Sequence, residues 1–333
     1  MGSNASCANG RYSLVDGWFL LGQACECCGQ QAKNGTQQRE LSFHGSFVRK
    51  FREEDYQIRA DANKHPGTWS AAVAISAATP ASVRYNIVMS QTASAITRSP
   101  AEIVQNSPVS QAPNGICYAH SGEITIADND LDRMIATVPV PIATALSRKA
   151  YYFVPLTVTQ GDETVIADRY DVALSDNAVC HRNLNLGDAQ CVFISTRLMD
   201  DKFSVAFEFY INVGHALVER AGVSQNFADL AWQQVEAGVR GETSLDAWEA
   251  RKFATAHGPD AEKYKNEYLA ASFADAISIY LLSLYLDVDY YDLRERDYPL
   301  LAPAPMAERL RKIAEIFPPN PGFEFNIYYR RRS

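Results

Sequence analysis

The spacing of hydrophobic and polar positions changes near residue 200. From about residue 68 to 200, short runs of small, β-branched and apolar residues are separated by turn signals, which indicates strands. After residue 200, apolar residues recur every three or four positions, which indicates helices. The pattern predicts an α+β protein with three parts: an irregular cysteine-containing segment over 1–67, a β-rich part over 68–200 and a helical part over 201–333.

The β-rich part contains several candidate strands and one candidate hairpin. Gly161-Asp162 is a turn signal between two apolar runs and predicts the hairpin. Three prolines between Ser94 and Asn114 predict a loop. The expected strands are Ser70–Ile75, Ser82–Ser90, Glu123–Ala127, Tyr151–Thr159, Glu163–Asp168 and Cys191–Ser195.

The helical part contains five segments with the apolar period of a helix. Gly222 ends the first, Ser244 caps the third, and Pro318-Pro319 follows the last. The first and fourth have apolar stripes that match, so we expect these two helices to pack against each other. The expected helices are Phe203–Ala221, Phe227–Ala237, Ser244–Phe253, Tyr264–Leu286 and Met306–Phe317.

Composition and charge narrow the classes of partner. Hydrophobic residues make up 47% and charged residues 21%, which is ordinary for a folded globular chain. The net charge of -8 repels phosphate, so we expect no nucleic acid and no anionic lipid surface as partner. No apolar run approaches the roughly 20 residues of a transmembrane helix. An odd total of 7 cysteines favours reduced thiols and a cytoplasmic location.

The N-terminal segment carries two candidate chemical features. Met1–Ser6 matches the N-myristoylation pattern and Cys7 is a candidate second acylation site, but a short unstructured start is the interpretation we favour. Cys25, Cys27 and Cys28 are dense enough to bind zinc, with Cys7 or His44 as a fourth ligand. The alternative is a group of free thiols in a turn, because the spacing differs from the usual CxxC pair.

The helix over 203–221 carries a polar row. Glu208, Asn212, His215 and Glu219 are spaced so that all four lie on one helix face. A solvated polar stripe is one explanation of this row. The helix is apolar around most of its remaining surface, which favours a site instead.

The order of three short segments resembles the zincin metallopeptidases. In that family an HExxH helix, often HExGH, supplies two zinc-binding histidines and a catalytic glutamate, and a later ExxAD segment supplies a third ligand. Ile211–His215 is similar to the first segment and Ala271–Asp275 to the second. Tyr298-Pro299 followed by Arg309 is similar to a His-Pro…Arg segment of some members. Cys191–Ser195 precedes the first helix as the family's active-site edge strand does.

The resemblance implies a zincin-like helical core in which most zinc-binding positions are replaced. Ile211 stands for the first histidine, Asn212 for the glutamate and Ala271 for the third ligand, whereas His215 and Asp275 are retained. We therefore expect a pseudoenzyme or binding module that engages a protein or peptide without zinc-dependent cleavage.

Two alternatives remain open. One is a metal-dependent hydrolase with a rearranged site, in which carboxylates and a histidine project from two facing helices. The other is a structural or assembly protein. The residues of the rearranged site would be Glu208, His215, Glu219, Glu267 and Asp275.

Overall fold

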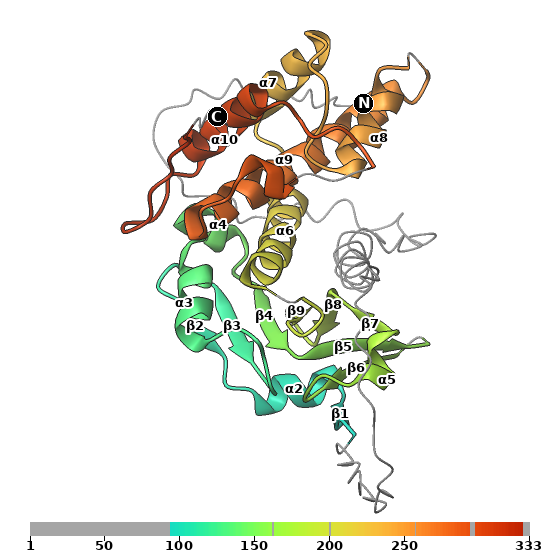
Figure 1. Cartoon of the computed structure of the whole chain (residues 1–333), viewed down its shortest axis with the longest axis vertical. Helices are drawn as coiled ribbons and strands as arrows, with labels where there is room; N and C mark the ends of the chain where they lie inside the picture. The colour runs from blue at the N-terminus through green and yellow to red at the C-terminus, as the bar shows by residue number, and fades with distance from the viewer. Residues whose placement is uncertain (1–93, 162, 200, 257, 294–296, 329–333) are drawn as a thin grey trace, which may run out of the picture. The chain divides into compact units, whose positions relative to one another are not determined.

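The computed structural model describes residues 94–161, 163–199, 201–256, 258–293 and 297–328 (Figure 1). All of them belong to one compact unit, Phe43–Ser333. The segment over 1–67, with its cysteine cluster and its acylation pattern, lies outside the described residues. The same holds for the strands expected at Ser70–Ile75 and Ser82–Ser90.

The described strands form two sheets. The order is β1-β6-β5-β7 in the first and β2-β3-β4-β9-β8 in the second. In the second sheet β3, β4 and β9 are mutually parallel, while β8 runs antiparallel to β9 at the edge. The strands are β1 (Thr97–Arg98), β2 (Ser110–Gln111), β3 (Cys117–His120), β4 (Lys149–Val154), β5 (Leu156–Gln160), β6 (Glu163–Ala167), β7 (Ala178–Val179), β8 (His181–Leu186) and β9 (Ala189–Ser195).

The sheets confirm part of the predicted strand pattern. β5 and β6 form the predicted hairpin, and Gly161 adopts a φ of 59° at its turn. Cys191–Ser195 lies within β9. The run Tyr151–Thr159 is not one strand, because it divides at Pro155 between β4 and β5, which belong to different sheets. Proline has no N–H for a ladder, so a change of sheet at this residue is favourable.

Two expectations about this part were wrong. Glu123–Ala127 forms no strand. Its alternation is too short to specify a ladder, and the Glu123 backbone N–H instead binds the carbonyl of Asp168. The region Ser94–Asn114 is not a plain loop, since it contains β1, β2 and helix α2 (Pro100–Asn106). Pro100 occupies the first turn of α2, where a proline starts a helix rather than ending one.

The helical part follows the predicted order. α6 ends at Gly222, whose φ is 73°, and Ser244 caps α8 by accepting from the Ala247 N–H. The chain is therefore α+β, with the strands in its N-terminal part and most helical residues C-terminal. The remaining helices are α3 (Asp128–Ala136), α4 (Val140–Ala145), α5 (Val172–Ser175), α6 (Lys202–Ala221), α7 (Gln225–Glu236), α8 (Leu245–Ala254), α9 (Ala261–Tyr285), the 3-10 helix η1 (Tyr290–Leu293) and α10 (Pro303–Ile316).

The five-stranded sheet is apolar on both faces because its residues alternate between two cores. One core joins α6 to the sheet, and there the rings of Tyr151 and Phe209 meet edge to face with centroids 5.0 Å apart. The other core joins the opposite face to α2 and β6 through Ile103 and Ile166. Burial on both faces explains the unbroken apolar runs Ala150–Val154 in β4 and Cys191–Ile194 in β9.

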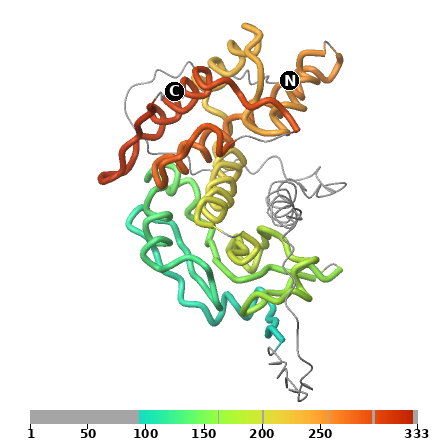
Figure 2. The backbone as a smooth tube through the Cα atoms, in the orientation of Figure 1, coloured from blue at the N-terminus to red at the C-terminus, as the bar shows by residue number. Residues whose placement is uncertain are grey.

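Helix α9 is the centre of the helical part and contacts α6, α7, α8 and α10. Figure 2 shows α6 (yellow) running up to α9 (orange). The Ser278 hydroxyl of α9 donates a 3.1 Å hydrogen bond to the Tyr210 carbonyl of α6. The predicted packing of these two helices is confirmed.

Length and composition alone would let α9 cross a membrane. It is the one such helix among the described residues, and 72% of its most apolar window is buried inside the protein. The core of a soluble protein contains helices of the same kind.

Candidate functional site

Helix α6 brings two of the predicted residues into a buried polar cluster. The Glu208 carboxylate is 4% exposed and lies 2.6 Å from Nδ1 of His181, the first residue of β8. The Asn212 amide donates to the Glu208 backbone carbonyl at 2.9 Å and to its carboxylate at 3.3 Å. Because a carboxylate only accepts hydrogen bonds, it holds the proton of His181 on Nδ1 and fixes the ring orientation. Nothing in the sequence links His181 to Glu208.

Cys180 borders this cluster. Its buried environment, and secondarily the charge of Glu208, raises the pKa of the Cys180 thiol to about 12. The thiol is therefore protonated at neutral pH and is not a nucleophile.

The other half of the predicted row has a different environment. His215 and Glu219 are exposed on α6, and the Glu219 carboxylate lies 3.7 Å from Nζ of Lys149 at the start of β4. Glu208, by contrast, contacts β8. Helix α6 thus crosses the sheet, so residues on one of its faces do not all meet the same neighbours.

Glu267 and Asp275 of α9 lie near α8. The Asp275 carboxylate accepts a 2.8 Å hydrogen bond from Thr243. Burial raises the pKa of Asp275 to about 6, although hydrogen bonds from Ser244 and Thr243 oppose the rise. Glu267 is exposed and lies 3.8 Å from the ammonium of Lys263.

Asp246 completes this acidic group and was missed in the sequence. Burial, and then the charges of Asp275, Glu249 and Glu267, raise the pKa of Asp246 to about 7. Its position in the first turn of α8 is common for an acidic residue, so no local pattern marks its environment as special.

The described contacts therefore divide the six predicted residues into separate groups. Glu208 contacts His181 and Asn212, the charges of Glu267 and Asp275 act on Asp246, and His215 and Glu219 are exposed. Within the described ranges, no group of three or more His, Cys, Asp or Glu side chains is arranged to hold a metal ion. The predicted zinc ligands Cys7, Cys25, Cys27 and Cys28, with His44, lie outside those ranges.

The edge of the sheet adds a feature that the sequence did not reveal. Among the described strands, β8 has only β9 as a neighbour. The Ser195 N–H donates to the Cys180 carbonyl, and these two residues lie opposite each other in the register of the ladder. Cys180 and Ser195 thus form a hydrogen-bonded pair, and along antiparallel strands such pairs alternate with pairs that are not hydrogen-bonded to each other. His181, Asn183 and Asn185 occupy the second kind of position, so their backbone N–H and C=O groups point away from β9.

This arrangement corrects one element of the zincin resemblance. Cys191–Ser195 was expected at the edge of the sheet, but β9 lies between β4 and β8. At this end of the sheet the outermost described strand is β8, which begins beside the polar residues of α6.

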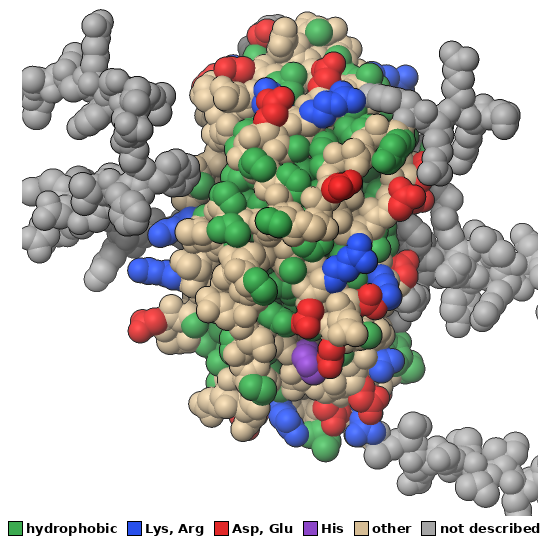
Figure 3. Space-filling model, turned by 90° about the vertical axis from the view of Figure 1, so that its left-hand side faces the viewer, with side chains coloured by type: hydrophobic (Ala, Val, Ile, Leu, Met, Phe, Trp, Pro, Cys, Tyr) green, Lys and Arg blue, Asp and Glu red, His purple; other side chains and the backbone are tan. Residues whose placement is uncertain are grey.

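The surface shows no large region of one charge on the face drawn in Figure 3. Among the described residues visible there, acidic and basic side chains are interspersed with apolar ones. Comparison of the chain with models of protein families, with curated proteins and with solved structures found no match. The proposal of a function therefore rests on the geometry of the site.

Proposed function

We propose that this protein is a zincin-like binding module that holds an extended segment of a protein or peptide along β8 and does not cleave it. The observation that carries this proposal is the outer edge of β8, which begins at the His181–Glu208 pair beside α6. An edge strand binds an extended chain through main-chain hydrogen bonds, and nearby side chains select its sequence.

The residues along this edge suit such a role. Asn183 and Asn185 are exposed, whereas Leu184 and Leu186 pack toward the core on the opposite face. The strand is thus anchored through one face of the sheet, its polar side chains lie on the other face, and its outward backbone groups point away from β9 in the plane of the sheet. His181, fixed by Glu208, would contact the bound segment at one end of the edge.

The chemistry of α6 and α9 supports binding without hydrolysis. Ile211 and Ala271 have no atoms that bind zinc, and Asn212 is no general base. The nearby Glu208 carboxylate is already hydrogen-bonded to His181 and Asn212. His215 alone does not hold a catalytic zinc ion.

Replacing Asn183 by proline tests the role of the edge. Proline removes the outward N–H but leaves the hydrogen bonds to β9 in place. Asn183→Ala is the matched control, since it removes the side chain and keeps the N–H. Peptides of about 12 residues would be selected from a random display library on the full chain, because a strand of this length spans the edge.

We expect selected peptides to bind the wild type and Asn183→Ala with similar affinity. They should bind Asn183→Pro at least about 10-fold more weakly, because one or two hydrogen bonds are lost. Equal binding by Asn183→Pro, with its circular dichroism unchanged, would place the peptide elsewhere. A library that yields no binder would refute a general peptide-binding role.

A second candidate is a hydrolase with a rearranged carboxylate and histidine site. The 2.6 Å contact between Glu208 and His181 favours it, because a buried carboxylate orients an imidazole for general-base catalysis. The two candidates differ in the fate of the bound peptide, which is intact in the first and cleaved in the second.

A further inference from the structure

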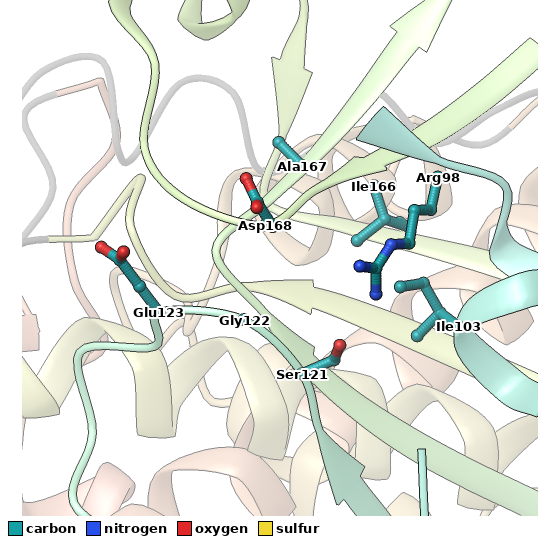
Figure 4. A pocket seen from close by; sticks show the side chains of 8 residues that line it. All are labelled: Arg98, Ile103, Ser121, Gly122, Glu123, Ile166, Ala167 and Asp168. Atoms are coloured by element: carbon teal, nitrogen blue, oxygen red, sulfur yellow. The ribbon is translucent and has the colours of Figure 1, made fainter. Parts of the chain in front are cut away.

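A hollow of about 270 Å³ lies at the end of β3, far along the sheet order from β8 (Figure 4). It is formed where the loop after β3 meets β1, α2 and the end of β6. The carboxyl ends of parallel strands are where ligands bind in open sheets that contain such strands. The residues that line it are Arg98, Ile103, Ser121, Gly122, Glu123, Ile166, Ala167 and Asp168.

The hollow combines an apolar wall with one cationic group. Ile103, Ile166 and Ala167 are buried and contribute the apolar surface. In Figure 4 the guanidinium of Arg98 lies next to Ile103, and the hydroxyl of Ser121 is directed toward the same region. A planar guanidinium next to an apolar wall matches a carboxylate on a short aliphatic body.

The two acidic residues of the lining have other partners. Oδ1 of Asp168 accepts hydrogen bonds from the Ile96 N–H at 2.9 Å and from Arg169 at 3.4 Å. The Glu123 carboxylate lies 4.0 Å from the guanidinium of Arg197. Figure 4 shows both carboxylates on the side of the hollow away from Arg98.

The Arg98 side chain makes no hydrogen bond or ion pair with the described residues, whereas the Arg98 backbone pairs with Ile166 of β6. The charge of Arg98 acts on Glu102, whose carboxylate is hydrogen-bonded to the backbone and hydroxyl of Ser99 in the cap of α2. That cap, and to a smaller extent the charge of Arg98, lowers the pKa of Glu102. The donors of the Arg98 guanidinium are therefore available to a ligand.

Gly122 holds the loop in the conformation that shapes the hollow. Its φ is 77°, and a Cβ at this position would lie 2.5 Å from the carbonyl oxygen of Asp168. Only glycine allows this close approach. The same carbonyl accepts a hydrogen bond from the Glu123 N–H, which fastens the loop after β3 to the end of β6.

We propose that this hollow binds a small aliphatic carboxylate, with its carboxylate on Arg98 and Ser121 and its hydrocarbon part on Ile103 and Ile166. The carboxylate would belong to a free small acid or to the C-terminus of a polypeptide chain. The site does not depend on peptide binding at β8.

The test uses the full chain and isothermal titration with four probes: isovalerate, the tripeptide Ala-Ala-Val, the same tripeptide with an amidated C-terminus, and inorganic phosphate. We expect saturable binding of at least one of the two free carboxylates and none of the amidated peptide. Binding of isovalerate identifies a free acid as sufficient, and binding of the tripeptide alone identifies a polypeptide C-terminus.

Variants test the assignment to Arg98. Arg98→Gln should weaken the binding about 10-fold or more, because charge-assisted hydrogen bonds are lost, and Arg98→Lys should fall in between. Arg220→Gln removes the same charge from the exposed end of α6 and should leave the affinity unchanged. No carboxylate binding by the wild type, equal binding by Arg98→Gln, or a preference for phosphate would overturn the proposal. Arg98 is exposed, so circular dichroism of its variants should match the wild type.

Discussion

Replacing Glu242 by glutamine is expected to lower the free energy of unfolding by about 3–5 kcal/mol. The Glu242 side chain is fully buried, and its carboxylate lies 2.9 Å from Arg309 and 2.8 Å from Arg251. It also accepts a 3.1 Å hydrogen bond from the Tyr268 hydroxyl. Glutamine keeps the shape of the side chain but leaves the fully buried Arg309 without its counter-charge.

Urea denaturation measures this effect, with Glu315→Gln as the control. Glu315 forms an exposed ion pair with Lys312, so its loss should change the free energy by about 0.5 kcal/mol or less. A change below about 1 kcal/mol for Glu242→Gln would show that this network does not stabilise α8, α9 and α10 as we infer.

Replacing Gly214 by alanine is expected to destabilise the protein by about 1–3 kcal/mol. A Cβ at Gly214 would lie 2.5 Å from the Ala274 carbonyl oxygen and 2.9 Å from the Ser278 hydroxyl. Helices α6 and α9 would have to separate to admit the methyl group. Alanine at an open position inside a helix would instead stabilise by about 1 kcal/mol, so the sign of the change reports the contact.

Gly258→Ala is the matched control for this substitution. No atom lies within 4 Å of a Cβ built at Gly258, so we expect little change in the midpoint of thermal unfolding. A Gly214→Ala variant as stable as the wild type would contradict the close packing of α6 on α9.

The sequence predicted the helical part well because its signals are local. The apolar period, Gly222 and the Ser244 cap each act within a few residues and mark the bounds of α6 and α8. The packing of α6 on α9 followed from the same apolar period. The glycine of the Ile211–His215 segment has a packing explanation, because a Cβ at Gly214 would meet the backbone of α9.

The N-terminal strands were harder to predict because their partners are distant in sequence. β8 was missed, since Asn183 and Asn185 are poor strand formers and its place depends on pairing with β9. The change of sheet at Pro155 also depends on tertiary structure.

The candidate site was predicted only in part for the same reason. Spacing on α6 placed Glu208 and Asn212 together, but the third member, His181, comes from another element 27 residues away. Spacing also grouped His215 and Glu219 with them, because helical periodicity does not show that α6 crosses the sheet. Asp246 and Glu242 have partners on other helices that no local pattern indicates.

Binding without cleavage can be tested by the mass of the bound peptide. A peptide selected on the full chain is incubated with the protein and equimolar Zn²⁺, and mass spectrometry then records whether it is intact. An active zinc peptidase digesting the same peptide serves as the positive control. We predict that the peptide is recovered intact, because Ile211, Asn212 and Ala271 supply neither zinc ligands nor a base. Cleavage that stops with a chelator or with His215→Ala, or that is lost in His181→Gln, would contradict the proposed function.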